Sequence, residues 1–469
     1  MNELPITLVE AQELMTSGAA TAVDLANGFL ERINARNSEL NIFLEVFEDV
    51  LDQAAEADRR RADGFSHPLL GVPVVIKDNI LFAHHRASGG SKILENYIAP
   101  YSADVVERLR TVGAVILGRV NMDEFGMGTS GENSAYGSAK NPLDPTRVPG
   151  GSSSGVASAI AAGMTVIGVG TDTGGSCRLP AAFCGICGLY PTYGSCSRYG
   201  LMAYGSSLDQ PGPMGKTVDD CKALFNTLSG FDDRDAQSVP EGGRVVPTSE
   251  VRVIGVPRKL LTMPGISNKV KADFDELLGK LSAAGYEVRD IELPTAEYGV
   301  QAYYIIAPAE VSTNLARLDG IRYGVRAEGD DLLDIYMKSK GVGFGPETQR
   351  RLLLGAYVLS AGYKDAYYNK AMTVRELMRK EYYDALASVD VIITPTGVSG
   401  AFKLGEVVDP VSLYLMDLFT IPANLTGLPA LSVPYGTDVT GMPLGVQIMG
   451  PRFGEERLFA LGNVIEGLR

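Results

Sequence analysis

The first half of the chain repeats one pattern, in which a helical segment is followed by a short apolar segment. The helical segments "SADVVERLRTVG" and "SSGVASAIAAGM" precede "AVILGRV" and "TVIGVGTD", which have the length and apolar content of buried strands. A further strand candidate, "GVPVVIKDNI", follows the polar helical segment "EDVLDQAAEADRRRADG". Because this alternation is typical of layered α/β folds, the sequence predicts a large mixed, mostly parallel sheet sandwiched between helices.

The rest of the chain extends this prediction to both ends. Thr7 and Thr21 each begin a helix, and residues 251–293 add a strand, a helix and a strand. Strand patterns return near the C-terminus at "DVIITPTG", "ALSVPYG" and "LGVQIMG", before a last helix. We expect a single domain over residues 1–469, with a catalytic core at about 60–230, a helical cover at about 297–388, and C-terminal strands that complete the sheet at about 389–469.

Composition excludes several classes of protein. The formal net charge of −14 opposes direct binding to nucleic acid, because the phosphate backbone is itself negative. The apolar run "GVASAIAAGMTVIGVG" is shorter than a membrane span, and "MNELPITLVEAQ" lacks the basic and apolar regions of a secretory signal. We therefore expect a soluble cytoplasmic protein with no membrane partner.

The five cysteines are an odd number in a chain with no sign of secretion, which argues against a disulfide framework. Cys184 and Cys187 form a C-x-x-C pair, the spacing of a redox motif or half of a zinc site. However, no second pair has ligand spacing, and the chain contains only three histidines. The sequence thus predicts buried structural thiols and no metal.

Two glycine-rich stretches, "PGGSSSG" at 149–155 and "GTDTGGS" ending at Ser176, stand out among the 54 glycines of the chain. Neither has the spacing of a phosphate-binding loop. Consecutive backbone N–H groups beside a serine hydroxyl are instead what the stabilisation of a tetrahedral oxyanion requires. Taken alone, "PGGSSSG" is more simply a helix-capping loop. Together, the two stretches indicate a serine nucleophile.

A serine nucleophile needs a base, and histidine is a poor candidate here. The G-x-S-x-G motif is absent and the three histidines all lie at 67–85, in a context that does not mark them as bases. Lys77 ends the apolar segment "PVVIK", where burial lowers the pKa of an amine from its ordinary value of about 10.4. The alternative is a strand-end lysine whose amine reaches solvent.

Together, Lys77, "GGSSSG" and "GTDTGGS" resemble the amidase signature family of serine hydrolases. The resemblance implies that Ser176 is the nucleophile, that Ser152 bridges it to the base after a cis peptide bond with Gly151, and that Lys77 is the base. It also implies an oxyanion hole, formed by the backbone amides of Thr173, Gly174, Gly175 and Ser176.

Longer stretches, including "NLARLDGIRYG", "GAYVLSAGYKDAYY" and "YLMDLFTIPANLTGLPALSVP", resemble the A subunits of the bacterial glutamyl-tRNA(Gln)/aspartyl-tRNA(Asn) amidotransferases. That resemblance implies that Arg351 and Asp417 bind the α-carboxylate and α-amino group of glutamine, with Thr129 and Tyr304 lining the pocket. It implies B and C subunits as partners, ATP and Mg in the partner subunit with no cofactor in this chain, and tRNA held by the complex.

The sequence departs from that subfamily at Tyr190, where lysine is usual, at Cys177 after the nucleophile, and at Ser195, where arginine is usual. The lost basic residues predict a weakened surface for a partner or for the path of ammonia, and Cys177 predicts an oxidisable site. Two other functions stay open. One is a freestanding amidase for another small amide, against which the charged pair Arg351 and Asp417 argues; the other is a catalytically silent scaffold.

Overall fold

The computed structural model of the chain describes residues 4–469, and its first two helices begin where the sequence predicts. The hydroxyl of Thr7 caps the first helix and that of Thr21 caps the second, each accepting from the backbone N–H of an acidic residue three positions later. Each acidic side chain bonds back to the cap backbone, which completes a capping box. The two predicted helix starts are confirmed.

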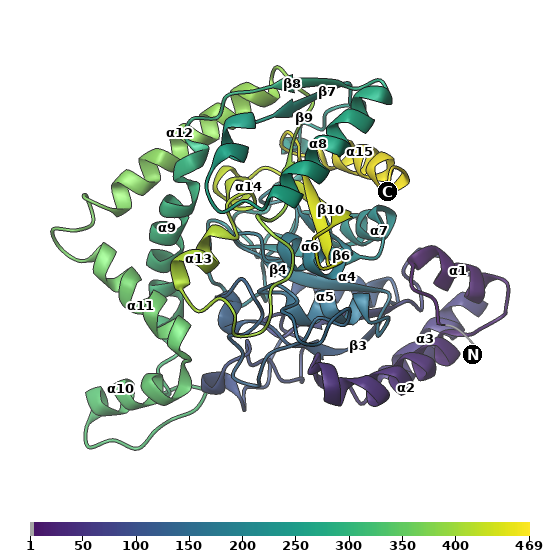
Figure 1. The fold of residues 1–469 in the computed structure, drawn as a ribbon. Coiled ribbons are helices and arrows are strands. Elements are labelled where there is room, and N and C mark those ends of the chain that lie inside the picture. The colour runs from purple at the N-terminus through teal and green to yellow at the C-terminus, as the bar shows by residue number, and fades with distance from the viewer. Residues whose placement is uncertain (1–3) are drawn as a thin grey trace.

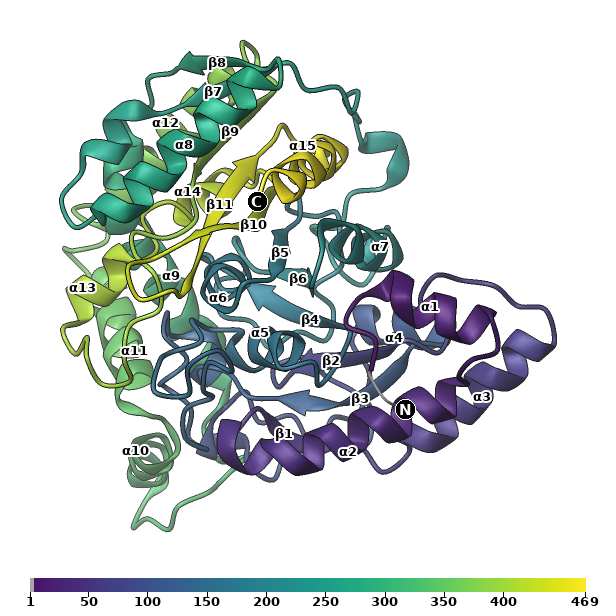
Figure 2. The ribbon, with the colours of Figure 1, turned by 45° about the vertical axis from the view of Figure 1, so that its right-hand side comes forward.

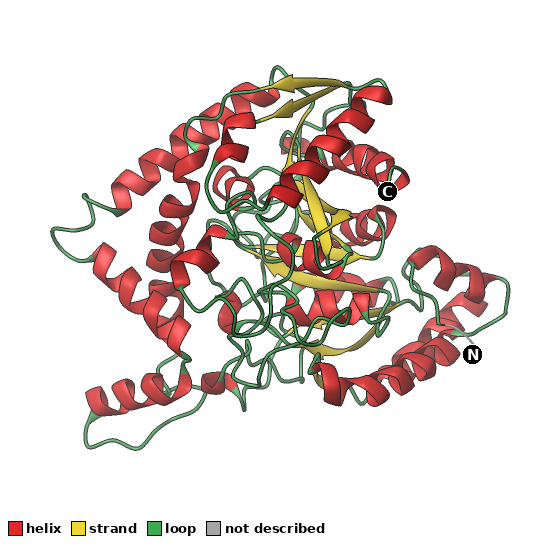
Figure 3. Ribbon diagram, in the orientation of Figure 1, coloured by secondary structure: helices red, strands yellow, loops and turns green. Residues whose placement is uncertain are grey.

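Within residues 4–469 the strands form one eleven-stranded sheet in the order β1-β3-β2-β4-β6-β5-β10-β11-β9-β7-β8 (Figures 1 and 3). The strands are β1 Phe43–Val46, β2 Pro73–Lys77, β3 Val115–Val120, β4 Ile167–Asp172, β5 Cys187–Tyr190, β6 Gln210–Gly215, β7 Val253–Val256, β8 Glu287–Asp290, β9 Val391–Pro395, β10 Ala430–Thr437 and β11 Pro443–Met449. The C-terminal strands β10 and β11 lie inside the sheet, so the C-terminal segment joins its two halves.

The α/β fold class and the large mixed sheet are confirmed, but the prediction that most strands are parallel is wrong. Only β2–β3, β2–β4, β7–β8 and β7–β9 pair in parallel among the described strands, and the remaining pairs are antiparallel. The central strands β5 and β6 were not predicted. β6 has the sequence "QPGPMG", whose prolines and glycines have low strand propensity, so its central position comes from tertiary packing.

Helices cover both faces of the sheet. They are α1 Leu8–Thr16, α2 Ala22–Leu40, α3 Val50–Ala62, α4 Asp104–Thr111, α5 Ser154–Ala161, α6 Arg178–Cys184, α7 Val218–Leu228, α8 Asn268–Ala283, α9 Gly299–Asn314, α10 Leu332–Gly343, α11 Pro346–Leu359, α12 Tyr368–Leu386, α13 Pro410–Leu415, α14 Ile421–Thr426 and α15 Glu455–Gly467. Helices α5 and α6 pack together on one face, and α4, α7 and α15 on the other (Figure 2). Helices α9–α12 run along one side of the molecule, opposite α1–α3 (Figure 1).

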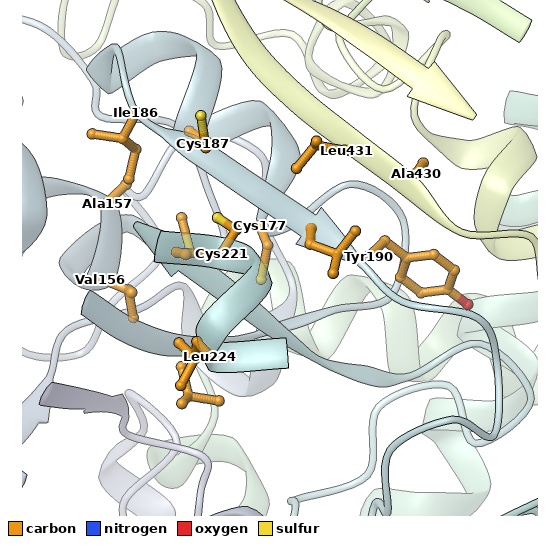
Figure 4. Packing of buried hydrophobic residues seen from close by; sticks show 14 of the residues in the cluster. Val156, Ala157, Cys177, Ile186, Cys187, Tyr190, Cys221, Leu224, Ala430 and Leu431 are labelled. Carbon is orange, nitrogen blue, oxygen red and sulfur yellow. The ribbon is translucent and has the colours of Figure 1, made fainter. Parts of the chain in front are cut away.

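The core of the central sheet contains the cysteines. Figure 4 shows Cys177, Cys187 and Cys221 among aliphatic side chains such as Val156 and Leu431. All five cysteines are buried and free, as predicted for structural thiols. No group of three His, Cys, Asp or Glu side chains in residues 4–469 is arranged to hold a metal ion. Nor does that part of the chain contain a helix with the length and apolar character needed to cross a membrane.

Candidate active site

Lys77 is the last residue of β2, and its amine is completely buried. Because β2 and β4 are parallel neighbours, Lys77 lies beside the end of β4. Its Nζ lies 2.7 Å from Ser152 Oγ, 2.9 Å from Ser153 Oγ, 3.0 Å from Thr171 Oγ1 and 3.1 Å from the Thr171 carbonyl oxygen. All four partner atoms are uncharged oxygens, so the amine has hydrogen bonds but no carboxylate in direct contact.

The pKa of Lys77 is lowered to about 8, because burial penalises the charged ammonium form. Negative charge on Asp123, Asp172 and Asp209 acts in the opposite direction from a distance. A neutral amine donates two hydrogen bonds and accepts one. The Ser152 hydroxyl can therefore donate to Nζ while the Thr171 carbonyl accepts from it, which is the arrangement required of a general base.

Ser152 lies in the loop before α5, and the peptide bond between Gly151 and Ser152 is cis, as the family resemblance predicts. The Gly151 N–H donates to the Thr129 carbonyl at 2.7 Å, and the Ser152 carbonyl accepts from Asp123 N–H at 3.2 Å. A Cβ atom on Gly151 would lie 1.9 Å from Asp123 Oδ2, so only glycine fits there. The Asp123 carboxylate in turn accepts from the backbone of residues 131 and 133.

Ser176 lies between β4 and α6 and keeps 8% of its surface exposed. Its carbonyl accepts from the Ser153 N–H at 3.0 Å, which joins the two glycine-rich loops. Among residues 4–469 no hydrogen bond joins the hydroxyls of Ser152 and Ser176. The structure thus brings Ser152 into contact with Lys77 and places Ser176 in the adjoining loop.

Asp172 and Arg178 enclose the nucleophile loop, and sequence reasoning assigned neither a role. They form an ion pair of 2.9 Å with both side chains completely buried. Burial acts to raise the pKa of Asp172, but the charge and hydrogen bonds of Arg178 and a bond from Asn424 together lower it. Arg178 also donates to the Thr420 carbonyl, Gln447 and Asn424. The sequence signal for this pair was the placement of Asp172 directly before "TGGSC" and of Arg178 directly after it.

The predicted oxyanion hole is only partly available. The Gly175 N–H donates to Asp172 Oδ1 at 2.9 Å, so this amide is already engaged, and the place of Gly175 in the oxyanion hole stays a prediction. Thr173 is held by a 2.6 Å bond from its hydroxyl to Asp209. The amides of Thr173, Gly174 and Ser176 have no hydrogen-bond acceptor within the described part of the chain, and these three N–H groups can receive an oxyanion.

Three of the predicted substrate-binding residues meet in one buried cluster. Asp417 Oδ2 accepts from the Thr129 hydroxyl at 3.0 Å and from the Tyr304 hydroxyl at 3.2 Å. Burial raises the pKa of Asp417 to about 7, against the effect of the Thr129 bond and of the positive charge on Arg351. Thr129 also connects this cluster to Ser152, because its carbonyl accepts from Gly151.

Arg351, the fourth predicted residue, faces the same cluster from α11. The centre of its guanidinium lies 5.1 Å from the centroid of the Tyr304 ring and 5.4 Å from that of Tyr414. Its Nε donates to Glu347 at 2.7 Å and its Nη1 to the Tyr204 hydroxyl at 2.7 Å. Sequence reasoning missed Glu347 and Tyr204. The i, i+4 spacing of Glu347 and Arg351 on a helix was the available signal for the first.

The departures from the subfamily pattern lie in the interior, not on a surface. Tyr190 is 0% exposed and Ser195 is 1% exposed, so the prediction that they belong to a weakened partner surface is wrong. The Tyr190 hydroxyl donates to the Leu208 carbonyl at 2.9 Å, and its ring lies 5.1 Å from the guanidinium of Arg178. Cys177 is also fully buried, and burial raises the pKa of its thiol to about 12, which opposes oxidation.

This fold and this set of residues define a serine hydrolase of the amidase type. A sequence model of the family described as Amidase matches residues 24–459, and the chain belongs to that family. It is 48% identical to the A subunit of the glutamyl-tRNA(Gln) amidotransferase of Thioalkalivibrio sulfidiphilus, over 97% of this chain and 96% of the relative. It is 46% identical to the protein of the same name from Microcystis aeruginosa, over 95% of this chain and 94% of the relative.

Solved structures show the same fold in proteins with different names. A crystal structure of the A subunit of glutamyl-tRNA(Gln) amidotransferase from Thermotoga maritima matches with a TM-score of 0.80 at 40% identity, covering 97% of this chain and 94% of that one. The peptide amidase from Stenotrophomonas maltophilia matches with a TM-score of 0.83 at 30% identity, covering 99% and 98%. Because the scores are nearly equal, the fold alone does not select a substrate within the family.

Proposed function

We propose that this chain is the glutaminase subunit of a tRNA-dependent amidotransferase, and that it releases ammonia from the side-chain amide of glutamine. The observation that carries the proposal is the joint placement of a buried cation, Arg351, and a buried carboxylate, Asp417, near the lysine and serines. Free glutamine carries one negative and one positive α group, and recognition of both requires such a pair. Nearly full-length similarity to A subunits supports the same function.

In the proposed reaction, neutral Lys77 takes a proton from Ser152, which takes the proton of Ser176 as its Oγ attacks the amide carbon of glutamine. The negative charge that develops on the amide oxygen is held by the N–H groups of Thr173, Gly174 and Ser176. The proton on Lys77 returns through Ser152 to the leaving nitrogen, and ammonia departs. Water, activated by the same relay, then hydrolyses the glutamyl ester and restores Ser176. The relay requires a hydrogen bond from the Ser176 hydroxyl to Ser152.

The second half of the proposal concerns partners. B and C subunits would form the complex, and the partner subunit would bind ATP and Mg and use the ammonia to amidate misacylated Glu-tRNA(Gln), Asp-tRNA(Asn) or both. This chain would need no cofactor, since the proposed chemistry uses only its own side chains and amides. The formal net charge of −14 supports the view that tRNA is held by other chains. The reaction would take place in the cytoplasm.

A freestanding amidase is the second candidate. The fold resembles that of a peptide amidase as closely as that of an amidotransferase A subunit, with TM-scores of 0.83 and 0.80. The two functions differ in what they require of Arg351 and Asp417. An amidase for neutral amides has no use for a buried cation and a buried carboxylate beside its nucleophile. We therefore rank it second.

The test is purification of the tagged chain from its native host, identification of the proteins that copurify, and assay of glutamine hydrolysis by that preparation. We expect two partner subunits and a glutaminase activity that Ser176→Ala abolishes. Full activity in Ser176→Ala would end the proposal. Hydrolysis of simple aliphatic amides without preference for glutamine would favour the freestanding amidase, and a wild-type chain that no serine reagent labels would favour a silent scaffold.

A further inference from the structure

Glu347 is a buried carboxylate on α11 that the proposed reaction does not use. Its Oε1 accepts from Arg351 Nε at 2.7 Å and from the Tyr414 hydroxyl at 3.0 Å, and its Oε2 accepts from Arg350 Nη1. With two arginines and one tyrosine as partners, the carboxylate is fully engaged. These hydrogen bonds hold the two arginines and the tyrosine in one geometry around Glu347.

Through Tyr414, Glu347 is also connected to Asp417, the negatively charged residue of the pocket. The rings of Tyr414 and Tyr304 are stacked, with 3.7 Å between centroids and 20° between planes. The Tyr304 hydroxyl donates to Asp417 Oδ2 at 3.2 Å. A single carboxylate therefore contacts Arg351 directly and Asp417 through two stacked tyrosines.

The contacts of Arg351 leave one end of its guanidinium for a ligand. Glu347 occupies Nε and the Tyr204 hydroxyl occupies Nη1, each at 2.7 Å. Within residues 4–469, Nη2 makes no hydrogen bond. A planar guanidinium fixed at two nitrogens presents the third in a set direction, which suits a carboxylate of the substrate.

We infer that Glu347 is a positioning residue that fixes Arg351 and Asp417 relative to each other, and that it thereby sets the preference for amides with free α-carboxylate and α-ammonium groups. This inference rests on the proposed glutaminase function. It does not require Glu347 to hold α11 in place, because Glu124 anchors the start of that helix. The Glu124 carboxylate accepts from the Gly345 N–H at 2.8 Å and from the Thr348 hydroxyl.

The experiment compares Glu347→Ala and Glu347→Gln with wild type and with Leu353→Ala, a 73% exposed position on the same helix. Phenylmethylsulfonyl fluoride, a neutral serine reagent without α groups, labels Ser176 in the purified complex, and glutamine is titrated as a protecting ligand. We expect Glu347→Ala to need about tenfold more glutamine for half protection, with an unprotected labelling rate within about twofold of wild type. Glu347→Gln should lie between, since its amide oxygen still accepts from Nε, and Leu353→Ala should match wild type.

The outcomes separate the two hypotheses. If glutamine protects wild type and protects Glu347→Ala equally well, Glu347 is not a positioning residue, although the proposed function stands. If the labelling rate falls as much as protection does, Glu347 is merely structural and the inference is wrong. If glutamine fails to protect the wild-type complex, the proposed function fails and the inference fails with it.

Discussion

Lys77 and Arg351 are two buried basic side chains of the same pocket region, and they differ in the charge of their hydrogen-bonding partners. Lys77 is surrounded by hydroxyl and carbonyl oxygens, whereas Arg351 is in direct contact with the carboxylate of Glu347 at 2.7 Å. Burial penalises the charge of both groups. With uncharged partners, burial lowers the pKa of Lys77 to about 8. Burial also acts to lower the pKa of Arg351, but its interactions with Tyr204, Tyr304 and the carboxylate of Glu347 raise that pKa overall, so the guanidinium stays charged.

This contrast shows how one protein interior can hold a neutral base and a permanent cation. The base must lose its proton to act, so contact with a carboxylate would oppose catalysis. The binding group must keep its charge, so a carboxylate partner supports recognition. Arg178 is likewise a buried cation paired with a carboxylate, that of Asp172 at 2.9 Å, and it has a structural role in the nucleophile loop.

The largest effect should come from making the base permanently charged. Lys77→Arg places a guanidinium, which does not lose its proton near neutral pH, beside Ser152. We expect the kcat for glutamine hydrolysis to fall by about 10³-fold or more, because general-base catalysis of the acylation step is lost. A thermal unfolding curve close to that of wild type would show that the chain still folds. Retention of more than a tenth of the activity would show that Lys77 is not the base.

Removing the anionic half of the binding pair should have the next largest effect. Asp417→Asn keeps the shape of the side chain but removes the negative charge that would hold the α-ammonium group. We expect the KM for glutamine to rise by about 10- to 100-fold, the range of a charge-assisted hydrogen bond, with a smaller change in kcat. An unchanged KM would remove Asp417 from the binding site.

The pH dependence follows from the lowered pKa of Lys77. Only the neutral amine accepts a proton, so kcat/KM should rise with pH and level off above pH 8. Between pH 8 and pH 7 we expect a fall of about tenfold for each pH unit, as the neutral fraction of Lys77 decreases. Below about pH 7 the fall should steepen, because burial raises the pKa of Asp417 to about 7 and its carboxylate also loses its charge there. Rates from pH 6 to 9 in a constant ionic medium would test this. A profile flat across pH 8 would contradict the assigned state of the base.

The smallest effect should come from Thr129→Val, which removes one hydrogen bond to Asp417 but leaves the carboxylate and its bond from Tyr304 in place. The carbonyl bond to Gly151 stays, because it belongs to the backbone. We expect KM to change by about two- to tenfold with kcat nearly constant. A large loss of kcat would instead show that the Thr129 side chain positions Ser152. The cluster around Asp417 would then be coupled to the catalytic residues by more than the backbone bond between Thr129 and Gly151.

Local signals allowed much of the fold to be predicted. The capping boxes at Thr7 and Thr21 and the strand ending at Lys77 depend on neighbouring residues, and the structure has them where the sequence places them. Strand β6 could not be predicted, because its prolines and glycines fit a central strand only through the packing around them. Without β5 and β6 the antiparallel centre of the sheet was missed, and the alternation of helix and strand suggested too many parallel pairs.

In the candidate site, too, some residues could be predicted from the sequence and some contacts could not. The glycine-rich motifs and the apolar segment before Lys77 indicated the residues near the base, and the resemblance to the amidotransferase A subunits indicated those near Asp417. They could not show that Asp172 takes the amide of Gly175, since that bond depends on how the loop closes. Nor could they show that Glu347 partners Arg351, because an i, i+4 pair on a helix is usually a surface feature. Partners set by tertiary packing are not visible in local sequence.

The most direct test is a titration of Lys77 itself. With lysine labelled at Cε with ¹³C, the Lys77 signal, assigned by its absence in Lys77→Arg, can be followed by NMR from pH 6 to 11 in the intact protein. Because burial lowers the pKa of Lys77 and its direct partners are uncharged, we expect a titration midpoint near pH 8. A midpoint at or above about 10.4, the ordinary value for lysine, would contradict it.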